Sequence, residues 1–197
     1  MKKIFLFLIA GMMLCACSKD VMDRTIFVPD QEDAQLPAYT EWGYNSFGAE
    51  YERSYFLASN RIIPCKVVYT GGQLQFALCG MFYERFGYGQ DMTLSFIFPF
   101  AQISEYKDLV QLDGVKIDLA DSACTVKLLQ NNVETTLGTV QGELYFKRAQ
   151  LLSIDEVVNR VILSGTFEVR FLQNGLPWAF SNGRFDMGIT GNVFYSN

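Results

Sequence analysis

The chain has 197 residues, half of them apolar, which is enough for one domain with a packed core. A formal net charge of -5 and the lack of any basic face in the pattern argue against nucleic acid as a partner. The histidine count is zero, which excludes Ser-His-Asp and Cys-His nucleophiles and histidine-ligated zinc or iron; no cofactor is expected.

Residues 1–16 have the plan of a secretory signal peptide. Lys2 and Lys3 supply a positive start, and an uncharged, mostly apolar run of eleven residues follows from Ile4 to Leu14. Eleven helical residues rise only about 16 Å, too little to cross a hydrocarbon core of about 30 Å. We therefore expect this segment to be removed during export.

The next residues resemble a known anchoring signal. The motif Leu14-Cys15-Ala16-Cys17 resembles the lipobox of bacterial lipoproteins, in which the second cysteine is acylated and begins the mature chain. The resemblance implies a lipid on Cys17, an outer-membrane location, and a domain on the periplasmic or cell-surface face. Ser18 resembles the outer-membrane sorting preference, and Lys19-Asp20 a partial surface-export signal of Bacteroidetes lipoproteins. The alternative is an ordinary signal peptide with an incidental cysteine.

Residues 17–40 indicate an acidic tether, because they hold two prolines and an acidic cluster from Asp30 to Asp33 and show little periodicity. A flexible coil of about 22 residues would reach about 25 Å. The acidic cluster lacks calcium-loop spacing, so no metal site is expected. Alternatively, Ile26-Phe27-Val28 adds a short strand to the domain.

Residues 41–197 predict a single domain of about ten strands, with turn signals every 8–12 residues and no long helical pattern. The expected fold is an all-β antiparallel sandwich or a partly closed barrel. The clearest early hairpin turns at Gly71-Gly72, and its register pairs Tyr69 with Leu74. In this register Cys65 and Cys79 lie on opposite faces, so no disulfide between them is expected.

Two further segments carry turn signals. Residues 115–119 and 124–128 predict a second hairpin, although its register places Lys116 opposite Lys127. Ser104 is expected to cap a short helix that runs through Leu109.

The C-terminal part predicts a three-stranded meander, because Asn174-Gly175 and Asn182-Gly183 are both hairpin-turn dipeptides. The resulting register aligns inward rows of Phe171, Trp178 and Met187 and of Val169, Phe180 and Phe185.

Two stretches resemble a group of Bacteroidetes lipoproteins of unknown function. The opening Gly43-Tyr44-Asn45-Ser46-Phe47-Gly48-Ala49 and the closing segments Gly165-Thr166-Phe167-Glu168 and Asn182-Gly183-Arg184-Phe185-Asp186 carry this resemblance. Where such proteins tend to have a Val-Asn-Gly turn, this chain has Tyr51-Glu52-Arg53. The resemblance implies no activity.

An aromatic turn is the first candidate binding site. It is expected to offer flat rings on which a sugar can stack, or else to pack into the core. Its residues are Phe82, Tyr83, Phe86 and Tyr88.

Arg184 and Asp186 are the second candidate, as a charged clamp for a ligand. The alternative is a cross-strand charge ladder with Glu168 and Arg170, which would contribute only about 0–1 kcal/mol per exposed pair.

These features favour a non-catalytic lipoprotein at the membrane surface that binds a glycan or a protein partner. A pilus- or adhesin-like subunit is the alternative, in which the C-terminal strand would pair with a neighbouring molecule. A histidine-free carboxylate hydrolase is the third possibility.

Overall fold

A computed structural model describes residues 24–59, 64–83, 89–154 and 157–196, and these ranges are nearly all β-structure, as predicted. The bounds in chain order are β1 (Ser46–Tyr51), β2 (Ser54–Ala58), β3 (Cys65–Thr70), β4 (Gln73–Tyr83), β5 (Gln90–Pro99), a 3-10 helix (Tyr106–Leu112), β6 (Lys116–Asp118), β7 (Thr125–Gln130), β8 (Val133–Thr136), β9 (Gly138–Ile154), β10 (Val157–Gln173), β11 (Leu176–Ile189) and β12 (Phe194–Ser196). Within these ranges, no helix has both the length and the apolarity to span a membrane.

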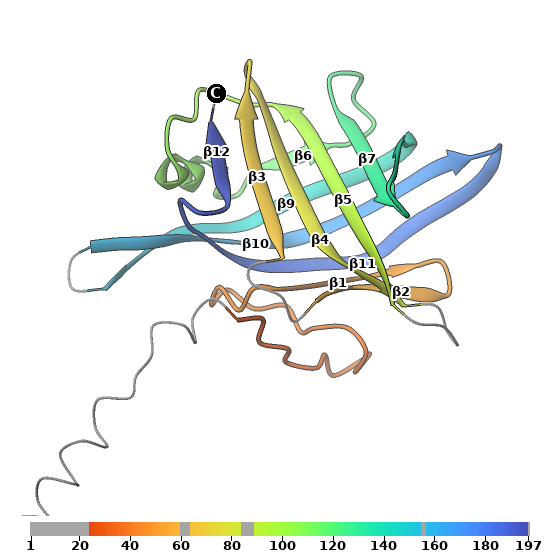
Figure 1. Cartoon of the computed structure of the whole chain (residues 1–197), viewed down its shortest axis with the longest axis horizontal. Coiled ribbons are helices and arrows are strands. Elements are labelled where there is room, and N and C mark those ends of the chain that lie inside the picture. Colours follow the sequence, from red (N-terminus) through yellow and green to blue (C-terminus); the bar gives the residue numbers. More distant parts are fainter. Residues whose placement is uncertain (1–23, 60–63, 84–88, 155–156, 197) are drawn as a thin grey trace, which may run out of the picture.

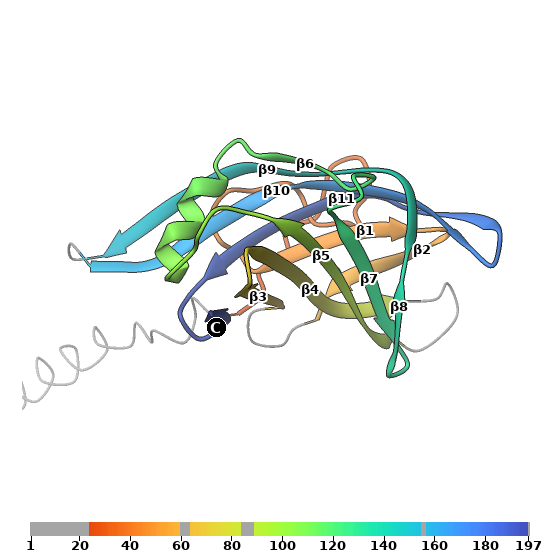
Figure 2. The same cartoon turned by 90° about the horizontal axis from the view of Figure 1, so that it is seen from above.

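The strands form one folded-over sheet in the order β6-β9-β10-β11-β1-β2-β4-β5-β7-β8, with β3 beside β4 and β12 beside β3. In Figure 1 the strands β3, β4, β5 and β7 cross over β9, β10 and β11, and the view in Figure 2 separates these two layers. The end strands β6 and β8 are not paired with each other, so the sheet is a sandwich and does not close into a barrel.

Phenylalanine rings fill the space between the layers. Phe76 on β4 meets Phe146 on β9 with ring centroids 5.4 Å apart, and Phe96 on β5 meets Phe167 on β10 at the same distance. All four rings are almost fully buried, at no more than 1% exposure. Edge-to-face pairs of this kind contribute about 0.5–1.5 kcal/mol beyond the burial of their area.

The β3–β4 hairpin has the predicted register. Tyr69 pairs with Leu74 and Cys65 with Leu78, and both turn glycines take positive φ, at 58° for Gly71 and 79° for Gly72. The three described cysteines are free thiols.

Beyond this hairpin, β4 continues into a corner of the sheet. Its first half pairs with β3, whereas its last four residues pair with β2. Gly80 lies at the corner, where a Cβ atom would collide with the carbonyl oxygen of Leu57 and the ring of Phe47. Only glycine allows the two backbones to approach this closely.

The second predicted hairpin is wrong. Strand β6 pairs with β9, whereas β7 pairs with β5 and β8. The predicted pairing would have set two lysines opposite each other, and the observed one gives each a carboxylate. Lys116 lies 3.3 Å from Glu143, and Lys127 lies 2.7 Å from Glu134. The predicted short helix exists as the 3-10 helix, but its N-cap is Glu105 and not the predicted Ser104.

The C-terminal meander exists, but its strands are β9, β10 and β11. Asn174-Gly175 forms the predicted turn, and Phe171 pairs with Trp178 as expected. The turn predicted at Asn182-Gly183 is wrong, because β11 runs straight through this dipeptide. Asn182 takes a φ of 52°, and the register with β10 shifts here. The left-handed residue that suggested a turn instead forms a β-bulge.

Residues 24–44, here called the strap, correct the predicted extent of the tether. Ile26 N–H donates to the Tyr44 carbonyl (2.8 Å), and Ala38 N–H donates to the Val28 carbonyl (2.7 Å). The side chain of Leu36 is completely buried. The acidic stretch from Asp30 onwards is therefore folded against the domain beside β1 and β11, as Figure 1 shows. Residues 17–23 of the predicted tether lie outside the described residues.

Candidate functional site

Asp186 is a buried carboxylate that fastens the strap to β11. It is 1% exposed and accepts five hydrogen bonds. The donors are Thr40 Oγ1 (2.6 Å), the backbone amides of Trp42 (3.1 Å), Gly43 (2.8 Å) and Tyr44 (3.2 Å), and Ser164 Oγ (2.8 Å). The carboxylate predicted as half of a ligand clamp is thus occupied by groups of its own chain.

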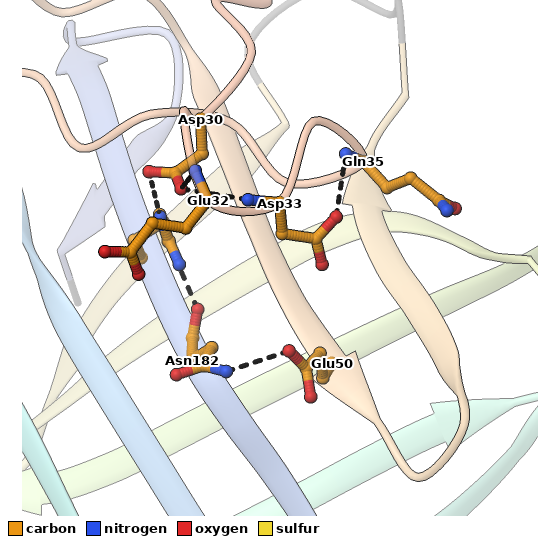
Figure 3. Close-up of polar contacts among 7 residues, drawn as sticks. Asp30, Glu32, Asp33, Gln35, Glu50 and Asn182 are labelled. Atoms are coloured by element: carbon orange, nitrogen blue, oxygen red, sulfur yellow. Dashed lines mark hydrogen bonds and ion pairs between the residues drawn. The ribbon is translucent and has the colours of Figure 1, made fainter.

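Arg184, the other half of the predicted clamp, is also held within the chain. Its Nη1 donates to Asp30 Oδ2 (2.6 Å), and its Nε donates to the carbonyl of Asn182 (3.3 Å). Figure 3 shows this group, in which the Asn182 side-chain amide also donates to Glu50 (2.8 Å). Arg184 therefore ties the acidic turn of the strap to β11.

The acidic turn is organised around the Asp30 carboxylate, which accepts hydrogen bonds from the amides of Glu32 (3.0 Å) and Asp33 (3.3 Å). These amides, followed by the charge and hydrogen bond of Arg184, hold the pKa of Asp30 below its ordinary value of 3.8. The Asp30 carboxylate of this turn is bonded to amides of the turn itself and to Arg184. Contacts of Arg184 and Asp186 with the strap replace the charge ladder predicted along β10 and β11.

The residues of the aromatic turn are not gathered into a platform by the part that the structure describes. Phe82 is partly buried against the core, and its ring lies 5.4 Å from that of Tyr51. Tyr83 is 39% exposed. Phe86 and Tyr88 lie outside the described residues, as does Cys17 with its signal peptide.

A concave surface lies on the outer face of β9, β10 and β11. It is an open groove of about 840 Å³, with Tyr39 of the strap and Arg184 among its lining residues. Gln141, Glu168 and Arg170 also line it, and the structure gives none of these three exposed side chains a hydrogen bond or ion pair. Arg170 pairs directly with Gln141 across β10 and β9.

The groove also carries a row of carboxylates. Asp118 on β6 pairs with Glu143 on β9, which in turn pairs with Glu168 on β10. Like charges opposite each other destabilise a sheet, and Lys116 offsets part of this by its ion pair with Glu143. No cluster of three possible ligands for a metal ion is found among the described residues.

Sequence reasoning found part of this surface. It placed Glu168 and Arg170 side by side on the outward face of one strand, but assigned them to a charge ladder with Arg184 and Asp186. It missed Gln141 and the carboxylate row, because those follow from the pairing of β9 with β6 and β10. The alternation of polar residues along β9 was the available signal.

The described cysteines do not supply an activated nucleophile. Burial raises the pKa of Cys65 and Cys79, and burial with the charges of Asp121 and Asp118 raises that of Cys124. All three thiols are therefore protonated at neutral pH, the form that does not attack electrophiles.

Comparisons with protein-family models, with curated proteins and with solved structures gave no match to this chain. The resemblance to Bacteroidetes lipoproteins remains a prediction. Its quoted segments are neighbours in space, since Phe47 on β1 pairs with Phe185 on β11, which pairs with Gly165 on β10.

Proposed function

We propose that this protein is an outer-membrane lipoprotein, anchored through Cys17, that binds a glycan in the groove over β9–β11 without catalysing a reaction. The observation that carries the proposal is the set of uncommitted polar side chains on a concave surface, Gln141, Glu168 and Arg170. The volume of about 840 Å³ lies within the range of sites for small ligands, roughly 300–1,000 Å³.

The chemistry of these side chains suits a molecule dense in hydroxyl groups. Arg170 offers several fixed donors, Glu168 only acceptors, and Gln141 both. A sugar hydroxyl both donates and accepts, so neighbouring hydroxyls can bridge this set. The cross-strand pairing of Arg170 with Gln141 holds donors and acceptors at a fixed spacing.

The test is a glycan array with the chain from residue 18 onward, followed by calorimetric titration of the best-bound glycan. We expect Arg170→Ala and Glu168→Gln each to weaken binding by about tenfold or more, the usual effect of losing a charged hydrogen bond. The matched control is Arg53→Ala, which removes an exposed arginine outside the groove. Equal affinity of all three variants would contradict the groove as the binding site, and binding of a protein in place of any glycan would contradict the ligand.

A carboxylate hydrolase is the second candidate, favoured by Glu143 directly opposite Glu168 in the groove. Pairs of carboxylates flanking a bond are the groups that hydrolyse glycosides. Chromatography of the titrated glycan distinguishes the two proposals, because shortened products would indicate hydrolysis.

A pilus- or adhesin-like role has less support. The C-terminal strand β12 pairs with β3 of its own chain, with Phe194 opposite Val67. A strand donated to a neighbour would instead be unpaired at home.

A further inference from the structure

Three consecutive apolar side chains of the strap are turned toward solvent. Ile26 is 41% exposed, Phe27 45% and Val28 39%. In an extended chain, successive side chains point to opposite sides, so one of three neighbours is normally covered. We call these three residues the strap patch.

The strap patch is held in a fixed position. Backbone hydrogen bonds fasten its two ends, from Ile26 to Tyr44 and from Ala38 to Val28. The loop between Ala38 and Tyr44 therefore begins and ends against the patch. This loop carries Trp42, whose side chain is 71% exposed although its amide is bound to Asp186.

The distance from the expected lipid limits where this surface lies. From Cys17 to Arg24, where the described chain begins, there are 24 − 17 = 7 residues. Seven residues span at most about 25 Å, whatever their conformation. The patch begins two residues further on, so the strap is the part of the domain closest along the chain to the membrane.

We propose that the strap patch and Trp42 insert into the interface of the membrane that holds Cys17, and so fix the orientation of the domain. The inference rests on the lipid anchor of the proposed function. Tryptophan and apolar side chains prefer this interface, where a ring meets both hydrocarbon and headgroups. The acidic turn from Asp30 to Asp33 follows the patch, so the contact is apolar and does not require anionic lipid.

The chain offers a direct probe of this contact. It has two tryptophans, and Trp178→Phe keeps a ring at the partly buried position and leaves Trp42 as the only indole. The lipidated mature protein, which begins at Cys17 and carries this substitution, is reconstituted into phosphatidylcholine vesicles whose acyl chains are brominated. Flotation of the vesicles reports the anchor, and quenching of Trp42 emission reports the contact.

We expect Trp42 emission to shift to shorter wavelength and to lose intensity on the brominated vesicles, with no dependence on salt. The triple variant Ile26→Ser, Phe27→Ser, Val28→Ser should float equally well but recover the intensity. The control Val133→Ser with Leu176→Ser changes residues exposed to 63% and 62%, and should remain quenched.

Two results would overturn the inference in different ways. Protein that floats but shows unquenched emission, or equal quenching in the triple serine variant, removes the patch contact and leaves the anchor intact. Protein that does not float lacks the anchor, and then both the proposed location and the membrane contact fail.

Discussion

Asp186 joins parts of the chain that lie far apart in sequence. Its contribution to the free energy of unfolding comes from its five hydrogen bonds. Alanine at this position leaves buried amides and hydroxyls without an acceptor, each at a cost of about 1–3 kcal/mol. We expect Asp186→Ala to lower the free energy of unfolding by about 3–5 kcal/mol, measured by equilibrium denaturation in urea.

The control for Asp186→Ala is Glu168→Ala, which removes an exposed carboxylate without a bonded partner. It should change the free energy of unfolding by no more than about 0.5 kcal/mol. A similar small effect of Asp186→Ala would mean that the strap is not fastened through this carboxylate.

At the scale of one element, the bulge in β11 depends on the left-handed backbone of Asn182. Valine rarely adopts a positive φ because its branched Cβ collides with the backbone. Asn182→Val should therefore cost about 1–3 kcal/mol of unfolding free energy, whereas Asn182→Gly should cost less than about 1 kcal/mol. Thermal or urea denaturation of both variants measures the difference, and equal costs would show that the φ of residue 182 is not the reason for asparagine here.

The bulge in β11 also shows the limit of predicting a hairpin from a turn dipeptide. Gly71-Gly72 was interpreted correctly because the strands on either side sort their polar and apolar residues consistently in one register. Asn182-Gly183 was not, because a positive φ serves a bulge as well as a hairpin. The pairing of β1 with β11 on both sides of the bulge decides between a bulge and a hairpin. No residue near Asn182 in the sequence indicates that pairing.

The hairpin predicted over 115–128 failed for a related reason. The partner of β6 is β9, and one partner of β7 is β5, so both choices depend on the whole sheet. The predicted placement of Lys116 opposite Lys127 was the one local sign against this hairpin. Pairings between distant strands follow from packing of complete layers, which the sequence of one segment does not specify.

For the molecule as a whole, the strap makes the free energy of unfolding depend on pH. The pKa of Asp30 is lowered in the folded state, so the unfolded chain takes up this proton first as the pH falls. The contribution of Asp30 is fully present above its ordinary pKa of 3.8 and is lost as the pH drops below that value toward the folded pKa.

Asp30→Asn should therefore reduce the acid sensitivity of the fold. The urea midpoint of the variant should fall less than that of the unchanged protein between about pH 6 and about pH 3. If the two midpoints fall equally, the contacts of Asp30 with Glu32, Asp33 and Arg184 do not favour its charged form.

The fold class could be predicted because alternation and turn spacing are properties of each strand. The site could not, because it depends on the assembled molecule. Asp186 alternates as an outward residue, and nothing near it in sequence shows that the strap covers it. The groove joins residues from four strands and the strap. Leu36 gave no signal of burial, because the prolines and acids around it are typical of a linker.

The bond between Asp186 and the amides of Trp42, Gly43 and Tyr44 spans more than 140 positions of sequence. Synthesis from the N-terminus produces the strap first and its acceptor almost last. A polypeptide truncated before residue 186 therefore keeps a loose strap with an exposed Leu36 and unpaired amides, which proteases cleave readily. The hydrogen bonds between Asp186 and the strap therefore form only in chains that include residue 186, and only these chains protect their N-terminal segment.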